Sequence, residues 1–118
     1  MIEILNKSDL NKVKDQELKD YLDYSFKRLP ENFDYPNDGY FVIIETFEEL
    51  IGEFIQLTNT QIPSLNTGLY DEINMVEMKD EIMEVLVFLD NDVSVSLILK
   101  MNILPSTHQN KLKEYVLC

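Results

Sequence analysis

The clearest pattern of apolar positions in this chain follows Thr46, where apolar side chains recur at the three- and four-residue spacing of one helix face. These are Phe47, Leu50, Ile51, Phe54 and Ile55. Thr46 and Glu49 match a capping box, in which a hydroxyl and a carboxylate each satisfy a backbone N–H at a helix start. The pattern predicts a helix from Thr46 with Glu48, Glu49 and Glu53 on or towards the side opposite the apolar stripe.

Two further segments have helical spacing. The first starts after Asp9, which offers an N-cap oxygen, and extends to about Leu29, where Pro30 ends it. Its apolar spacing becomes regular only from Leu18, so its well-packed part is predicted to begin near Asp15. The second starts at Pro105 and Ser106, extends to about Leu117, and has its apolar members at Leu112, Tyr115 and Val116.

Five segments have the pattern of β-strands. They are Ile2 to Leu5, Tyr40 to Ile44, Glu72 to Met78, Met83 to Leu89 and Val93 to Met101. The third alternates only moderately, and a short helix is its alternative. Asp90 to Asp92 predicts a tight reversal that joins the last two strands as a hairpin. The expected fold is a single α+β domain over residues 1–118, with a largely antiparallel sheet and about three helices packed on it.

Composition agrees with one folded domain. The chain has 118 residues, of which 45% are apolar, and this is enough to build a core despite a net charge of −12. The single cysteine, Cys118, has no partner within the chain, which favours a reducing compartment. No signal-peptide pattern is visible, and the longest apolar run, Val85 to Leu89, is too short for a membrane span. We therefore expect a cytoplasmic protein.

Negative charge is concentrated in the middle of the chain. Between Leu29 and Met78 there is no Lys or Arg, and ten carboxylates account for most of the net charge. They are Glu31, Asp34, Asp38, Glu45, Glu48, Glu49, Glu53, Asp71, Glu72 and Glu77. A concentrated negative field repels nucleic acid and anionic membranes and speeds encounter with basic proteins. The expected partner is therefore a basic protein, with no direct nucleic-acid or membrane binding.

Residues suited to catalysis are scarce. The chain has one histidine, one arginine and no tryptophan, and it lacks the common phosphate-loop, zinc and serine-hydrolase motifs. His108 lies near a helix start and is predicted to face solvent. We expect no catalytic residues, no metal and no cofactor. The alternative is a small enzyme that uses a pair of carboxylates, because 22 acidic residues always bring some pair together.

Tyrosines interleave with the carboxylates, an arrangement that suits a protein interface because Tyr adds contact area and a hydroxyl to charge steering. The predicted partner-binding residues are Asp34, Tyr35, Asp38, Tyr40, Glu48, Glu49, Glu53, Tyr70, Asp71, Glu72 and Glu77. The competing interpretation is that Phe33 and Tyr40 cap the core and that the carboxylates only keep the domain soluble.

Three features together resemble the immunity proteins of contact-dependent growth inhibition and related polymorphic toxin systems. They are the stretch Asn32 to Tyr40, the Glu-lined helix after Thr46 and the hairpin Glu84 to Met101. The resemblance implies a cognate toxin, often a nuclease, whose basic cleft an acidic face plugs. A phage or mobile-element protein that imitates nucleic acid to block a host defence enzyme is the alternative of the same physical type.

Overall fold

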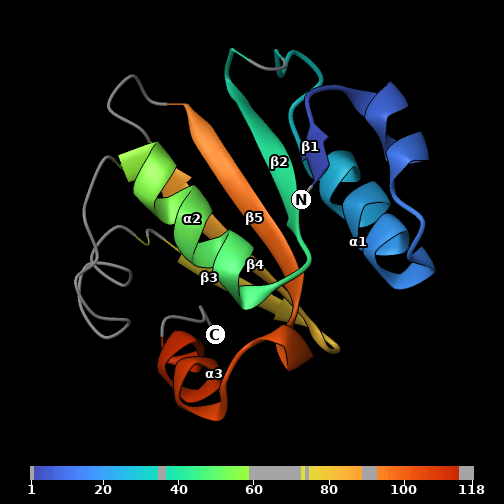
Figure 1. Ribbon diagram of the computed structural model, residues 1–118. Coiled ribbons are helices and arrows are strands. Elements are labelled where there is room, and N and C mark those ends of the chain that lie inside the picture. Colours follow the sequence, from blue (N-terminus) through green and yellow to red (C-terminus); the bar gives the residue numbers. More distant parts are fainter. Residues whose placement is uncertain (1, 35–36, 59–72, 74, 89–92, 115–118) are drawn as a thin grey trace.

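The computed structural model describes residues 2–34, 37–58, 73, 75–88 and 93–114, with the side chains of 54–58 excepted. Figure 1 shows the arrangement of the elements. The strands are β1 (Ile2–Ile4), β2 (Gly39–Ile44), β3 (Met75–Lys79), β4 (Ile82–Phe88) and β5 (Ser94–Lys100). The helices are α1 (Gln16–Lys27), α2 (Phe47–Thr58) and α3 (Ser106–Lys113), with 3-10 turns η1 (Lys7–Lys12) and η2 (Met101–Ile103).

The strands form one five-stranded sheet in the order β1-β2-β5-β4-β3. Three of its neighbouring pairs are antiparallel, including the predicted β4–β5 hairpin, in which Ile82 lies opposite Lys100. The exception is the central pair, β2 and β5, which run parallel from Gly39 opposite Ser94 to Ile44 opposite Leu99. The predicted fold class, an α+β domain with a largely antiparallel sheet, is therefore confirmed.

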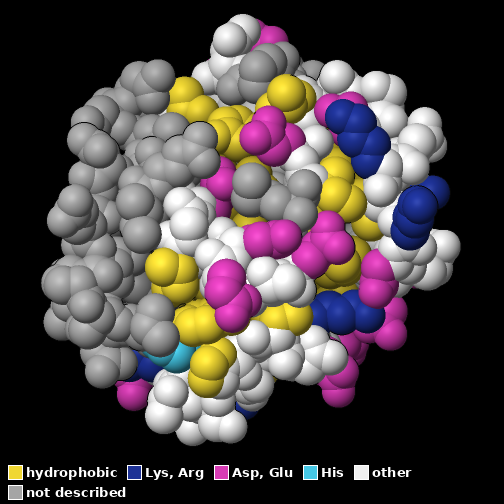
Figure 2. Space-filling view, viewed as in Figure 1, with side chains coloured by type: hydrophobic (Ala, Val, Ile, Leu, Met, Phe, Trp, Pro, Cys, Tyr) yellow, Lys and Arg dark blue, Asp and Glu magenta, His cyan; other side chains and the backbone are white. Residues whose placement is uncertain are grey.

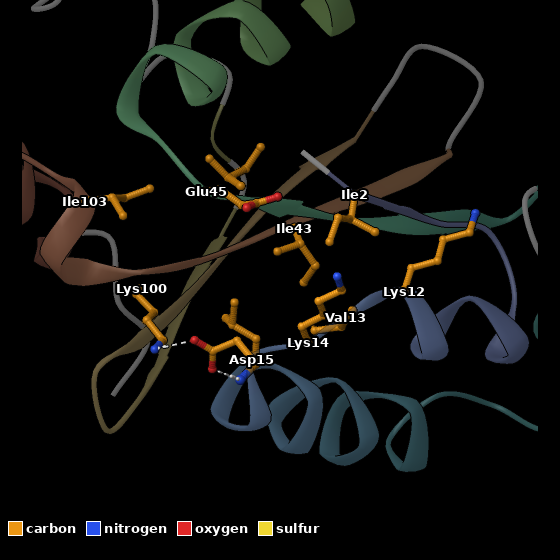
Figure 3. Close-up of a pocket in the computed structure, with 11 residues that line it drawn as sticks. Ile2, Lys12, Val13, Lys14, Asp15, Ile43, Glu45, Lys100 and Ile103 are labelled. Atoms are coloured by element: carbon orange, nitrogen blue, oxygen red, sulfur yellow. Dashed lines mark hydrogen bonds and ion pairs between the residues drawn. The ribbon is translucent and has the colours of Figure 1, made fainter.

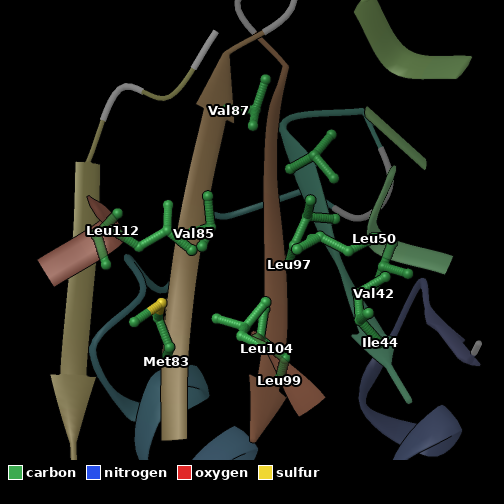
Figure 4. Packing of buried hydrophobic residues seen from close by; sticks show 12 residues of the cluster. Val42, Ile44, Leu50, Met83, Val85, Val87, Leu97, Leu99, Leu104 and Leu112 are labelled. Atoms are coloured by element: carbon green, nitrogen blue, oxygen red, sulfur yellow. The ribbon is translucent and has the colours of Figure 1, made fainter. Parts of the chain in front are cut away.

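Each face of the sheet is covered by helix. On one face α2 and α3 pack over the alternate residues of β2, β4 and β5, and Figure 4 shows Leu50 and Leu112 entering this cluster from the two helices. On the other face α1 packs through Tyr21, Leu22 and Phe26. Because successive strand residues point to opposite faces, Val42 faces α2 whereas Phe41 faces α1.

The first predicted helix is wrong in its first half. The chain forms the 3-10 turn η1 and then extends through Val13 before α1 begins after Asp15. Asp15 caps α1, because its carboxylate accepts hydrogen bonds from the N–H groups of Glu17 and Leu18 at 3.0 and 3.2 Å. The prediction that the packed part starts near Asp15 is confirmed.

Three other predicted boundaries fall wholly or partly outside the described residues. The third strand begins at Met75, and its predicted start at Glu72 lies outside the described residues. The last helix, α3, is described to Lys113, so its predicted extension through Tyr115 to Leu117 also lies outside them, as does the predicted reversal at Asp90 to Asp92.

Candidate functional site

The predicted partner-binding residues Asp34 and Asp38 are exposed in the loop before β2, and they hold that loop together. The Asp38 carboxylate accepts a hydrogen bond from the Asp34 N–H at 2.9 Å, and the Asp34 carboxylate accepts one from the Asn37 side chain at 2.9 Å. The next residue, Gly39, starts β2 in close contact with β5. A Cβ on Gly39 would lie 2.4 Å from the Ser94 carbonyl oxygen, which explains a glycine at this position. Both carboxylates therefore have a structural task besides any binding role.

The start of α2 carries two more of the predicted residues. Glu48 is exposed, and Glu49 takes part in the predicted capping box in a shifted form. The Thr46 hydroxyl accepts a hydrogen bond from the Glu49 N–H at 3.2 Å, as in the motif. The Glu49 carboxylate accepts a hydrogen bond from the N–H of Glu45 at 2.9 Å, whereas in the motif it would accept one from the N–H of Thr46. These bonds, chiefly the one from Glu45, hold the pKa of Glu49 below its ordinary value.

Glu53 was predicted on the exposed side of α2, and this is wrong. Its side chain is only 6% exposed. Burial, and next the negative charge of Glu3 on β1, raise the pKa of Glu53. Burial, followed by the charges of Glu53 and Glu3, also raises the pKa of the half-buried Tyr40. The three side chains thus form a carboxylate and phenol cluster where α2 covers β1 and β2.

Glu77 lies on the opposite face of the sheet. Its carboxylate accepts a hydrogen bond from the Arg28 guanidinium at 2.6 Å, as part of an ion pair between β3 and the end of α1. Glu77 therefore shares no face with Glu48 or Glu53, and its charge is already compensated. Of the remaining predicted residues, Tyr35, Tyr70, Asp71 and Glu72 lie outside the described residues.

The structure does gather one set of acids on the α2 side. We call this set the α2 acidic surface: Glu3, Glu48 and Glu49, with Glu45 at its edge, where it also lines a cavity on the α1 side of β2. The half-buried Tyr40 belongs to it through the charges of Glu3 and Glu53. Figure 2 shows acidic side chains over the middle of this face and basic ones towards its margin. Several basic side chains of the described residues pair with other acids, as with Lys12 and Asp9 at 3.1 Å or Lys27 and Asp23 at 3.2 Å.

A cavity of about 520 Å³ opens between the strands β1 and β2 and the link from η1 to α1. Figure 3 shows Ile2, Val13 and Ile43 along its apolar wall and Lys100 reaching Asp15. The Lys100 ammonium lies 2.6 Å from the Asp15 carboxylate, which lowers the pKa of Asp15 and raises that of Lys100. Since Asp15 also caps α1, this ion pair ties the start of the helix to the end of β5.

A second polar cluster, which the sequence interpretation missed, lies between α1 and β4. Glu84 is 9% exposed, and its Oε1 atom accepts hydrogen bonds from the Tyr21 hydroxyl at 2.6 Å, the Ser25 hydroxyl at 3.3 Å and Arg28 at 3.3 Å. Burial, and next the charge of Glu84, raise the pKa of Tyr21 far above its ordinary value, so the hydroxyl is a permanent donor. Arg28 also stacks on the ring of Tyr24.

The pattern around Glu84 contained a usable signal. Met83, Val85 and Val87 alternate along β4 and face α2, so Ile82, Glu84 and Leu86 face α1. A charged residue at an inward position of a central strand needs a compensating partner. The single arginine of the chain was the obvious candidate for that partner.

His108 was predicted to face solvent, and this is wrong. It is 4% exposed and its ring lies 4.9 Å from that of Phe47, centroid to centroid, where α3 meets α2. Burial lowers the pKa of His108. The imidazole therefore belongs to the packing between α3 and α2.

Comparisons with known proteins give no relative: no family model, no curated protein and no solved structure matches this chain. Among the described residues, no His, Cys, Asp or Glu side chains come together in threes as a metal site. In the same part of the chain, no helix has the length and apolarity to cross a membrane.

Proposed function

We propose that this protein is an acidic inhibitor that binds a basic protein, a cognate toxin domain, through the α2 acidic surface and the neighbouring loop of Asp34 and Asp38. The observation that carries the proposal is the separation of charge. Figure 2 shows acidic side chains over the middle of the α2 side and basic ones towards its margin, and every Lys and Arg belongs to residues 7–28 or 79–113. Such a field attracts a basic cleft before contact and orients the approaching partner.

Tyr40 supports the same proposal. It is half-buried among carboxylates, so it presents part of an aromatic ring to a partner while its position is fixed by the core. Aromatic anchors surrounded by charged groups are common at protein interfaces, and a stable complex buries roughly 800 Å² on each partner. Glu77 is left out of the proposed interface because it lies on the other face beside Arg28. Glu53 is left out as a direct contact because it is buried.

The test starts with co-purification of the tagged protein from its native operon and identification of what binds it. The captured partner is then assayed for activity with and without this protein. We expect a basic enzyme that loses its activity in the complex. Capture of an acidic protein, or of one whose activity is unchanged, contradicts the proposal.

Charge reversal locates the interface on the purified complex. Glu48→Lys, on the α2 acidic surface, should slow association several-fold, and the effect should shrink as salt shortens the Debye length from about 10 Å at 0.1 M to about 3 Å at 1 M. Asp20→Lys is the matched control, because it makes the same change in net charge at an exposed position of α1 on the other side of the sheet. Equal effects of the two substitutions would remove the α2 acidic surface from the interface.

A further inference from the structure

A cavity of about 260 Å³ lies on the α1 side of the sheet, next to the buried Glu84. We call it the Glu84 pocket. Its polar lining includes Ser25, Arg28, Glu77 and Ser96, and apolar walls come from Phe33, Leu86 and Phe88, among others. Phe88 is 51% exposed, which is unusual for a large apolar side chain and places an aromatic ring at the edge of the cavity.

Two buried oxygen atoms of this lining receive no hydrogen bond from the described residues. All three bonds to Glu84 reach its Oε1 atom, and among the described residues none reaches Oε2. Ser96 is 6% exposed, and its hydroxyl takes part in no hydrogen bond of the described residues. Buried polar atoms are satisfied in the great majority of cases, so an exception in a cavity wall indicates a missing partner.

The two atoms can serve one partner. On the antiparallel β4–β5 pair, Glu84 lies opposite Ile98 and Leu86 lies opposite Ser96. Glu84 and Ser96 are thus diagonal neighbours on the same face, with backbones about 7–8 Å apart and side chains closer than that. A group with several N–H donors can reach both oxygen atoms at once.

Charge selects the kind of partner. The pocket is lined by two carboxylates, Glu77 and Glu84, and by one cation, Arg28, so it carries an excess negative charge. Arg28 is held against both carboxylates and against the ring of Tyr24. Lys79 lies on the same ring, 3.9 Å from its centroid. One guanidinium thus faces two carboxylates, and a bound cation would balance the remaining negative charge.

We propose that the Glu84 pocket binds a small organic cation, a primary ammonium group on an apolar or aromatic body. The ammonium group donates hydrogen bonds to Glu84 Oε2 and to the Ser96 hydroxyl. The body lies against Phe33, Leu86 and Phe88, which shield it from water. This site is on the opposite face from the α2 acidic surface, so it does not depend on the proposed inhibitor function.

The test is an amide NMR titration of the ¹⁵N-labelled protein with phenethylamine at pH 7 and constant ionic strength. We expect saturable shifts at the backbone amides of Leu86, Phe88 and Ser96, with a dissociation constant below about 1 mM. Neutral 2-phenylethanol and anionic 3-phenylpropanoate have a similar body and should bind at least tenfold more weakly. Absence of saturable shifts, or equal binding of the three probes, overturns the proposal.

Substitutions assign the binding to the two oxygen atoms. Glu84→Gln should weaken phenethylamine binding at least tenfold, and Ser96→Ala several-fold. Glu81→Gln is the matched control, because it removes an equal charge at an exposed position in the β3–β4 turn and should leave the affinity unchanged. If Glu84→Gln does not fold, Ser96→Val decides, since it removes the acceptor and places a larger side chain in the cavity wall. Unchanged affinity in the Ser96 variants, or an equal loss with Glu81→Gln, refutes the site.

Discussion

Tyr21→Phe should destabilise the fold by about 2 kcal/mol at pH 7. The substitution removes one oxygen atom, which donates to the buried Glu84 carboxylate at 2.6 Å, and leaves the ring in the core between α1 and the sheet. A hydrogen bond to a charged group contributes about 1.5–3 kcal/mol to stability. Ser25 and Arg28 still donate to the same oxygen atom at 3.3 Å, so we expect the lower part of that range.

The measurement is urea unfolding followed by circular dichroism at 25 °C. Tyr24→Phe is the control, because Tyr24 is 39% exposed and its hydroxyl enters no hydrogen bond of the described residues. We expect a change within about 0.5 kcal/mol for that variant. A double-mutant cycle of Tyr21→Phe with Glu84→Gln should give a coupling energy of about 1 kcal/mol. Additive effects of the two substitutions, or equal effects of the two tyrosine variants, would show that the hydroxyl does not stabilise Glu84.

Three further predictions follow from burial and close packing. Gly39→Ala should lower the unfolding free energy by about 1–3 kcal/mol, because its Cβ would collide with the Ser94 carbonyl oxygen. Gly52→Ala is the control, because its Cβ meets open space in α2, and it should raise the unfolding free energy by about 0.5–1 kcal/mol. The opposite order in urea unfolding would contradict the structure. Burial raises the pKa of Glu53, so the folded state binds this proton more tightly than the unfolded state, and stability falls as the pH rises above about 4.5. Glu53→Gln should therefore stabilise the protein at pH 7 but not at about pH 3. Burial lowers the pKa of His108, so the unfolded state takes up a proton first, and stability falls as the pH drops below about 6.5. Because the chain has no other histidine, His108→Gln should flatten the dependence of stability on pH between about pH 7 and pH 5. An unchanged slope in this variant would refute the prediction.

Local sequence patterns predicted the elements well where the structure depends on neighbouring residues. The capping residues and apolar stripe of α2 are four or fewer positions apart, and the β4–β5 hairpin joins adjacent segments. The split between η1 and α1 was visible as a late onset of regular apolar spacing at Leu18. The residue at which α1 begins became clear only from the cap at Asp15.

The parallel pairing of β2 with β5 could not be predicted in the same way. Nothing in the alternation of either strand states which neighbour it pairs with, because that choice depends on how both faces are covered. The proposed interface met the same limit. Glu77 belongs to the acidic block of the sequence, but its position on β3 turns it towards Arg28, 49 residues earlier in the chain. Charge composition along a sequence does not say to which face of a sheet a charge points.

The position of β5 at the centre of the sheet has a consequence for how the protein folds. Its antiparallel neighbour β4 is also its neighbour in sequence, so that hairpin closes a short loop, whereas its parallel neighbour β2 lies about half the chain away. Closing the longer loop costs more conformational entropy before any contact compensates for it. The β3–β4–β5 meander can therefore assemble early, and docking of β2 along β5 is the step that should limit the folding rate.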